Sequence, residues 1–193
     1  MKIVQAKISN FRGIANGLVH LEDHCVLVGD NNAGKSTLLE AIDLVLGPER
    51  LSRRPVVDEH DFYAGQYLTT DGTPVQINVE VIISDLSGEQ IRHFRDHLEW
   101  WDSTSKSLLA GAPVEATDLP NVSAALRVFF RGGYDVEEDD FAGNTFFALP
   151  ETGDGVDFQP FRAPDKRKCG FLYLRTVRTG TRALSLERGS LLD

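Results

Sequence analysis

The feature that most constrains this chain is a glycine-rich segment between two apolar stretches. Residues 27–43 read LVGDNNAGKSTLLEAID, and within them residues 29–36 satisfy the pattern G-x-x-x-x-G-K-[ST]. The run CVLVG (25–29) before the loop predicts a central strand that is buried on both faces of a sheet. Residues 34–46 after the loop predict an amphipathic helix that ends at Gly47-Pro48. A strand, a glycine loop and a helix in this order are typical of a phosphate-binding site.

The residue types of the loop explain why phosphate is the expected ligand. Glycines let backbone N–H groups converge on phosphate oxygens, and the helix N-terminus adds partial positive charge. Lys35 is predicted to reach the β- and γ-phosphates and to act in catalysis, and the Ser36 hydroxyl is predicted to be a magnesium ligand. We therefore expect ATP and Mg as cofactors. The predicted loop contacts are Gly29, Asn31, Asn32, Ala33, Gly34, Lys35, Ser36 and Thr37.

Hydrophobic periodicity predicts an α/β fold with a mixed sheet and a largely antiparallel run of strands. The stretch TPVQINVEVIIS (73–84) alternates most clearly, with its apolar residues facing one way. Ser87 and Gln90 form a capping box, and the helix that they begin is expected to extend to Trp101. The other predicted strands are residues 2–9, 18–22, 125–131, 144–150 and 169–177. The stripes expected to be buried are Leu38, Leu39, Ile42, Val45 and Leu46 in the first helix, and Ile91, Phe94, Leu98 and Trp101 in the second.

Composition restricts the class of protein. The chain has 193 residues, of which 41% are hydrophobic, enough for one domain with a core. The two cysteines, Cys25 and Cys169, lie far apart without a C-x-x-C partner, so we expect neither a disulfide framework nor a zinc site, and both side chains buried. No apolar run approaches the length of a membrane span, and no secretion signal is evident. These features predict a cytoplasmic location and no membrane partner.

The net charge of −9 argues against general coating by nucleic acid, but the charge is unevenly spread. Residues 162–188 contain eight basic and two acidic residues. Such a patch can bind phosphate while the whole chain stays acidic, because salt screens charge beyond about 8–10 Å. A solvated surface is the alternative interpretation.

A magnesium-holding acid is harder to find. Asp85 ends the apolar run VEVIISD and could hold magnesium through water, as a strand-end aspartate does in many nucleotidases. The strict alternation of that run and the Leu86 that follows it favour a turn residue before the Ser87 cap instead. The cluster Asp58, Glu59, His60 and Asp61 matches no metal-site spacing, and it reads better as a polar loop beside the nucleotide.

Other clusters carry weaker signals. His93 and His97 stand four residues apart without the H-E-x-x-H pattern, so a surface position is expected. One ring of Trp100-Trp101 is expected to seal the core.

The order of motifs at the N-terminus resembles a known branch of ATPases. A strand that runs into ISNFRGI (8–14), a short second strand and VGDNNAGKSTLLEAI are similar to the start of the RecF/SMC branch of ABC-type ATPases. The resemblance implies that Arg12 contacts the nucleotide, and that Phe11 either does so or belongs to the core. The stretches GPERLSRRPVVDEHDFY and YLRTVRTGTRALSLERGSLLD look like the OLD (overcoming lysogenisation defect) family of ATP-dependent endonucleases, class 2.

This resemblance implies a function that depends on residues outside the sequence. In that family the signature motif, the Asp-Glu pair, the switch histidine and a Toprim nuclease domain lie further along the chain. We therefore expect residues 1–193 to be the N-terminal portion of an ATPase head that dimerises and couples ATP to DNA cleavage, with slow hydrolysis on its own. The resemblance leads to the hypothesis that at least one of three arginines, Arg175, Arg178 and Arg182, approaches nucleotide or DNA. The alternatives are a RecF- or SMC-like DNA-repair head, and a self-contained nucleotidase or kinase that uses Asp85.

Overall fold

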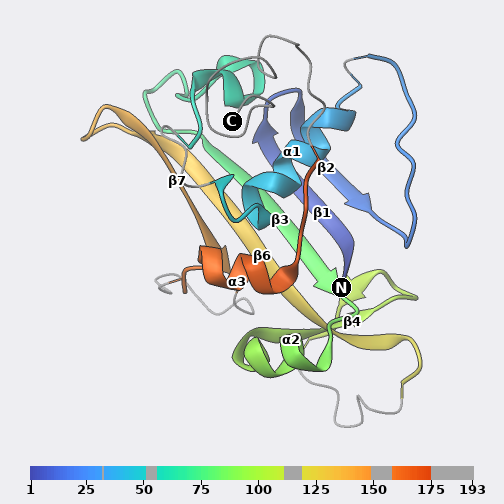
Figure 1. The fold of residues 1–193 in the computed structure, drawn as a ribbon. Coiled ribbons are helices and arrows are strands. Elements are labelled where there is room, and N and C mark those ends of the chain that lie inside the picture. Colours follow the sequence, from blue (N-terminus) through green and yellow to red (C-terminus); the bar gives the residue numbers. More distant parts are fainter. Residues whose placement is uncertain (32, 51–55, 111–118, 149–157, 175–193) are drawn as a thin grey trace, which may run out of the picture.

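The computed structural model describes residues 1–31, 33–50, 56–110, 119–148 and 158–174 (Figure 1). Its centre is a curled sheet of seven strands in the order β2-β1-β3-β6-β4-β5, with β7 also paired to β6. Every strand pair in the described residues is antiparallel, so the expected mixed sheet is not observed there. The strands are β1 (Lys2–Phe11), β2 (Ile14–His20), β3 (Gln76–Ser84), β4 (Leu98–Asp102), β5 (Ser107–Leu108), β6 (Val122–Asp135) and β7 (Asp140–Phe147).

Alternating apolar residues give the sheet one buried face. The alternation predicted for residues 73–84 is confirmed, because Ile77, Val79, Val81 and Ile83 in β3 are all fully buried. The helix α1 (Lys35–Leu46) packs on this inner face (Figure 1). The buried face therefore fixes where the helix after the glycine loop must lie.

The predicted helix after the glycine loop is confirmed with nearly the expected boundaries. Its buried stripe includes Leu38, Ile42 and Val45, whereas Leu39 is 42% exposed. Gly47 ends the helix, and a Cβ at that position would lie 2.4 Å from the Asp43 Oδ1 atom. Only glycine fits so close to the last turn, so the stop signal read from the sequence has a steric cause.

The second predicted helix is shorter than its periodicity indicated. The capping box of Ser87 and Gln90 is present, but α2 (Gly88–His93) ends after one and a half turns and is followed by the 3-10 turn η4 (Arg95–His97). Residues 98–102 form β4 instead, because their backbone pairs with residues 122–126 of β6. Phe94 and Trp101 are buried, as expected, but Ile91 is 38% exposed. The spacing therefore indicated burial for only part of the stripe, and tertiary pairing decided the backbone conformation.

Two predicted strands are wrong. Residues 25–29 have no regular structure, and Val26 and Val28 are 85% and 88% exposed. No described strand pairs with this segment, so its apolar side chains stay on the surface. Cys25 is therefore exposed rather than buried, whereas Cys169 is buried as predicted. Burial raises the pKa of the Cys169 thiol to about 12.

The predicted strand 169–177 is replaced in its described part by the end of a helix. Cys169 is the last residue of α3 (Ala163–Cys169), and Gly170 follows with a left-handed φ of 66°. Residues 171–174 have no regular structure, and residues 175–177 lie outside the described residues. A proline in the first turn and a glycine after the last residue are ordinary start and stop signals for a helix.

Two smaller differences concern loops. Strand β2 begins at Ile14, so the loop after β1 is a tight turn at Arg12 and Gly13 rather than residues 10–17. Two 3-10 turns, η2 (Glu59–Asp61) and η3 (Tyr63–Gly65), occupy the polar stretch 49–67. In the described part of the chain, no helix has the length and apolar character to cross a bilayer.

Candidate functional site

The glycine loop leads directly into α1, as a phosphate-binding loop requires. Gly34 adopts a left-handed φ of 83° at the N-cap of the helix, where a residue with a Cβ would be strained. An Ala33 N–H···O Asp30 bond of 3.1 Å closes a turn within the loop. Gly29 begins this loop and Gly34 ends it, so the two glycines of the motif bracket the turn. Asn32 lies outside the described residues.

The first turn of α1 presents backbone donors. The first bond along the helix runs from Leu38 N–H to Gly34 O at 2.9 Å. No side chain in the described residues caps the amides that precede Leu38, and the first turn contains no acid. The N–H groups of Lys35, Ser36 and Thr37 are therefore available to an anion, and the helix dipole favours one there.

The Lys35 side chain folds over the loop rather than away from it. Its Nζ atom donates to Gly29 O and to Asp30 O, both at 2.7 Å. These carbonyl oxygens accept hydrogen bonds from the ammonium group of Lys35. A phosphate oxygen could replace them with little movement of the Lys35 side chain. Lys35 therefore lies over the loop, and its contact with phosphate stays a prediction.

The donors present fit a triphosphate with magnesium. Three backbone amides, an ammonium group and the exposed Ser36 hydroxyl supply the positive charge and the oxygen ligand that such a group needs. Bound there, Mg-ATP would supply the phosphoryl group and the charge of the metal ion. Lys35 and the amides would hold the phosphates, and Ser36 would hold the metal.

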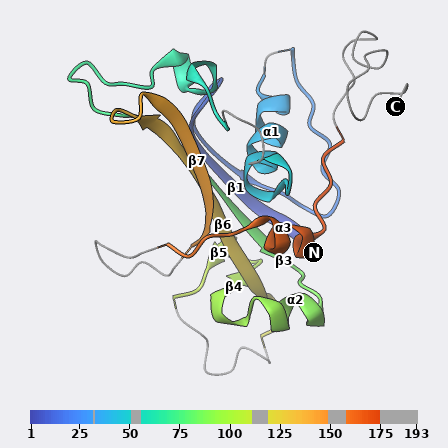
Figure 2. The ribbon, with the colours of Figure 1, turned by 60° about the vertical axis from the view of Figure 1, so that its left-hand side comes forward.

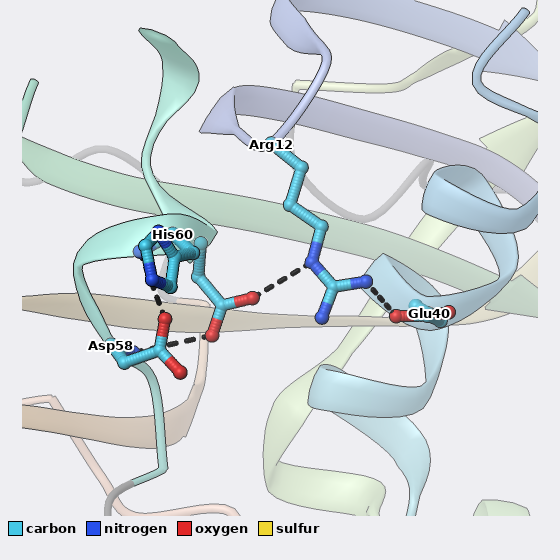
Figure 3. Close-up of polar contacts among 5 residues, drawn as sticks. Arg12, Glu40, Asp58 and His60 are labelled. Atoms are coloured by element: carbon cyan, nitrogen blue, oxygen red, sulfur yellow. Dashed lines mark hydrogen bonds and ion pairs between the residues drawn. The ribbon is translucent and has the colours of Figure 1, made fainter. Parts of the chain in front are cut away.

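Arg12 contacts the middle of α1 and is held by two carboxylates. Its turn packs against the helix, since a Cβ on Gly34 would lie 3.9 Å from the Ile14 side chain. Arg12 Nε donates to Asp61 Oδ1 at 2.7 Å, and its Nη1 donates to Glu40 on α1 (Figure 3). Burial opposes the charge of Arg12, but the hydrogen bond and charge of Asp61, with those of Glu40, raise its pKa above the ordinary value. The guanidinium therefore stays charged between Asp61 and Glu40.

The polar stretch 58–61 is the support of Arg12 rather than a metal cluster. Asp61 is 5% exposed, and its backbone oxygen also accepts from Arg12 N at 2.8 Å. Asp58 and Asp61 form a reciprocal capping box for η2, in which Asp58 Oδ1 accepts from His60 N at 2.8 Å (Figure 3). The side chains thus point at backbone and at Arg12. No group of three or more metal-ligating side chains occurs among the described residues, in keeping with the preferred interpretation as a polar loop.

Phe11, next to Arg12, belongs to the core. It is fully buried and bridges to Phe62, just after η2. The alternative that its ring contacts a nucleotide is therefore not supported. Phe11 and Arg12 instead fasten the turn after β1 to the loop around η2 through one apolar and one ionic contact.

Asp85 has the conformation of a turn residue. Its φ is 54° and its side chain is exposed. It lines a hollow of about 530 Å³ together with Leu38, Leu39 and Ile42 of α1. Neither Lys35 nor Ser36 lines that hollow, and the backbone conformation of Asp85 agrees with the turn interpretation.

The two histidines lie in different environments. His93 is a partly exposed residue whose Nε2 lies 3.0 Å from Asp165 Oδ1 on α3. The His97 ring stacks on Phe147 with centroids 3.9 Å apart, and burial lowers the pKa of His97. The surface position is confirmed for His93, whereas His97 is half-buried. Arg175, Arg178 and Arg182 lie outside the described residues.

Sequence reasoning missed the partners of Arg12 and a buried lysine. Glu40 faces away from the apolar stripe of α1, so its contact with Arg12 could not be read from periodicity. Lys166 in α3 is 1% exposed, and its Nζ lies 3.5 Å from Leu44 O and from Gly47 O at the end of α1. Burial lowers the pKa of Lys166 to about 8, although the charge of Asp43 raises it. A lone lysine in a basic run gives no signal of burial.

The loop and the helix that follows it have the arrangement of donors expected of a phosphate-binding site. Comparison with known families agrees with this arrangement: residues 1–148 match the AAA ATPase domain family, and the chain belongs to that family. Membership implies use of ATP, typically with magnesium. A search of curated proteins found no match.

Proposed function

We propose that this chain is the nucleotide-binding portion of an ATP-dependent DNA endonuclease of the OLD type. Residues 1–193 would form an N-terminal part of its ATPase head, and a Toprim nuclease domain would follow them. Support comes from the NFRG turn, the glycine loop and the two flanking stretches that resemble that family.

The single observation that carries the nucleotide part is the position of Lys35. Its Nζ is held at the mouth of a loop whose following helix has free amides, 2.7 Å from two loop carbonyls. Mg-ATP would replace those carbonyls as the partner of Nζ. Lys35, the amides and magnesium on Ser36 would then stabilise the charge on the transferring phosphoryl group.

The remaining parts of the proposal concern partners. ATP binding would promote a homodimer and gate DNA cleavage by the nuclease domain, so the partners are DNA and a second copy of the protein. Arg12 would sense the bound nucleotide. At present its Nε donates to Asp61 and its Nη1 donates to Glu40. If a phosphate oxygen replaced Glu40 as a partner of Arg12, the contact between the turn after β1 and α1 would change.

Nucleotide binding is tested with a matched pair of lysines. Lys35→Ala should abolish Mg-ATP binding, whereas Lys106→Ala, which removes an exposed lysine near β5, should leave it unchanged. Equal binding by both variants would contradict the proposed site. A rapid turnover that Asp85→Asn abolishes would instead support the self-contained nucleotidase.

The endonuclease part is tested by the coding sequence beyond residue 193 and by ATP-dependent cleavage of plasmid DNA by its product. An acidic Toprim pattern and cleavage lost in Lys35→Ala are expected. A long coiled-coil heptad repeat without cleavage would favour a RecF- or SMC-like DNA-repair head.

A further inference from the structure

The face of the sheet opposite α1 carries a row of polar side chains. Cross-strand register places Ser9 of β1 opposite Asn16 on β2 and Asn78 on β3, and places Arg131 of β6 opposite Asn78 and Asn144. The next residues along these strands (Ile8, Val79, Phe130 and Thr145) are buried on the inner face. The row therefore points outward across five strands, or about 19 Å at the usual strand spacing. α1 and α3 lie together on the other side of the sheet (Figure 2).

An aromatic cluster lies beside this row. The rings of Phe129, Phe146 and Phe158 have centroids 5.0–5.9 Å apart. The Arg131 guanidinium lies 5.5 Å from the Phe129 centroid and 5.2 Å from that of Phe158, and its Nε donates to Asn78 Oδ1 at 3.3 Å. Phe129 is buried, whereas Phe146 and Phe158 are partly exposed, so two reachable apolar rings and a flat cation lie next to neutral hydrogen-bonding groups.

Three cations (Lys7, Arg127 and Arg131) and two carboxylates (Glu80, which stands opposite Lys7, and Glu99) lie on this face, so it carries a small net positive charge. Arg127 donates to both carboxylate oxygens of Glu99 at 2.8 and 2.9 Å, and lies 3.7 Å from Glu80. Lys7 and Arg131 are exposed, and neither forms an ion pair with any other described residue. With Ser9, Asn78 and Phe158 they line a hollow of about 450 Å³. An acidic chain of net charge −9 therefore has a locally basic, aromatic and amide-rich surface here.

Few ligands match all three properties. A phosphate chain would be attracted by Lys7 and Arg131, unstacked bases can lie on phenylalanine rings or on a guanidinium plane, and amides can hydrogen-bond to base edges. A duplex hides its base faces, so it could use only the two cations. We propose that this outer sheet face binds single-stranded nucleic acid. This face lies across the sheet from α1 and is therefore separate from the proposed ATP site. The proposal rests on the proposed function only for DNA as a partner.

The direct test is fluorescence anisotropy with a labelled 20-nucleotide oligothymidylate, titrated at several salt concentrations. The wild-type chain should bind, and Lys7→Glu and Arg131→Glu should each weaken binding at least tenfold. Lys7→Ala should reduce the slope of log affinity against log salt by about 0.7, the value for one phosphate contact on a single strand. Phe146→Ala should weaken binding roughly 5- to 100-fold through lost stacking.

Matched controls separate this surface from general charge effects and from the ATP site. Arg95→Glu reverses an exposed charge on η4 and should bind as the wild type does. Lys35→Ala should lose ATP and keep the oligonucleotide, whereas Lys7→Glu should do the reverse. Absence of wild-type binding, equal affinity for a duplex of the same length, or equal losses in Arg95→Glu would each overturn the proposal. The first outcome would indicate a protein partner for this face.

Discussion

Two apolar runs in this chain have similar composition but opposite environments. Val79 and Val81 in β3 are fully buried, whereas Val26 and Val28 before the glycine loop are more than four-fifths exposed. β3 lies between β1 and β6, so both edges of its backbone are hydrogen-bonded. The segment 25–29 pairs with no described strand. An apolar run thus shows that burial would be favourable, but the pairing of its backbone decides whether burial occurs.

The residues that stabilise the fold and the residues that would bind the ligand lie in different parts of the molecule. Most of the fully buried side chains belong to the sheet and to the inner side of α1, whereas the groups that would hold phosphates lie in the exposed loop and the first turn of α1. Ligand-binding loops are drawn from the less stable parts of a fold, because they must adapt to the ligand. Changes in the two regions should therefore have different consequences for stability and binding.

A matched pair of valines gives the largest expected difference. Val81→Ala should lower the free energy of unfolding by about 2–3 kcal/mol, because it removes two buried carbons and leaves a cavity. Val28→Ala should change it by less than about 0.5 kcal/mol, since its side chain is already in water. Urea denaturation of both variants measures the difference. Equal losses would show that segment 25–29 is packed as tightly as β3.

The contact between the turn after β1 and the loop around η2 should also be measurable. Asp61→Ala leaves Arg12 Nε and the Asp58 N–H without their carboxylate partner, and should cost about 1–3 kcal/mol of unfolding free energy. Glu59→Ala is the control, because it removes a neighbouring carboxylate that is exposed. The Glu59 Oε1 atom lies 3.6 Å from His60 Nε2. If both variants unfolded at the same urea concentration, the Arg12–Asp61 contact would not stabilise the loop around η2.

The buried Lys166 should make the free energy of unfolding depend on pH by about 1 kcal/mol. The pKa of Lys166 is about 8 in the folded protein and 10.5 in its ordinary state, so above pH 8 the unfolded chain binds more protons. The Lys166 contribution to stability should therefore rise by about 1 kcal/mol between pH 8 and pH 9. Lys166→Met should lack this rise.

The difference in stability between the wild type and Lys166→Met cancels the effect of other groups that titrate in both proteins. The raised pKa of Cys169 acts in the opposite direction above pH 9, but Cys169 is present in both and cancels in the difference. Parallel stability curves for wild type and Lys166→Met would mean that Lys166 keeps its ordinary pKa.

The two cysteines give the smallest effect on stability and a clear contrast in reactivity. Cys25 is exposed in the loop region, whereas Cys169 is buried and its pKa is raised to about 12. A thiol reagent at pH 8 should react rapidly with one group per chain, and Cys25→Ala should abolish that reaction with little change in stability. Two rapidly reacting thiols, or none, would contradict the difference between the regions.

Local signals predicted part of the fold and most of the candidate site. The alternation in β3, the helix after the glycine loop and the capping box at Ser87 were read correctly, because each depends on residues close in sequence. The strand Leu98–Asp102 was mistaken for helix, since its pairing with β6 is not encoded in its own spacing. The contacts from Arg12 to Asp61 and Glu40 span 49 and 28 residues, and no local pattern could reveal them.

Calorimetric titration with Mg-ATP tests the central claim most directly, at protein concentrations high enough to detect weak binding. Wild-type protein should give a saturable heat, and Lys35→Ala should give none, because the amides at the start of α1 lose the cation that completes the phosphate site. Absence of heat with the wild type, or the same heat with Lys35→Ala, would contradict the account.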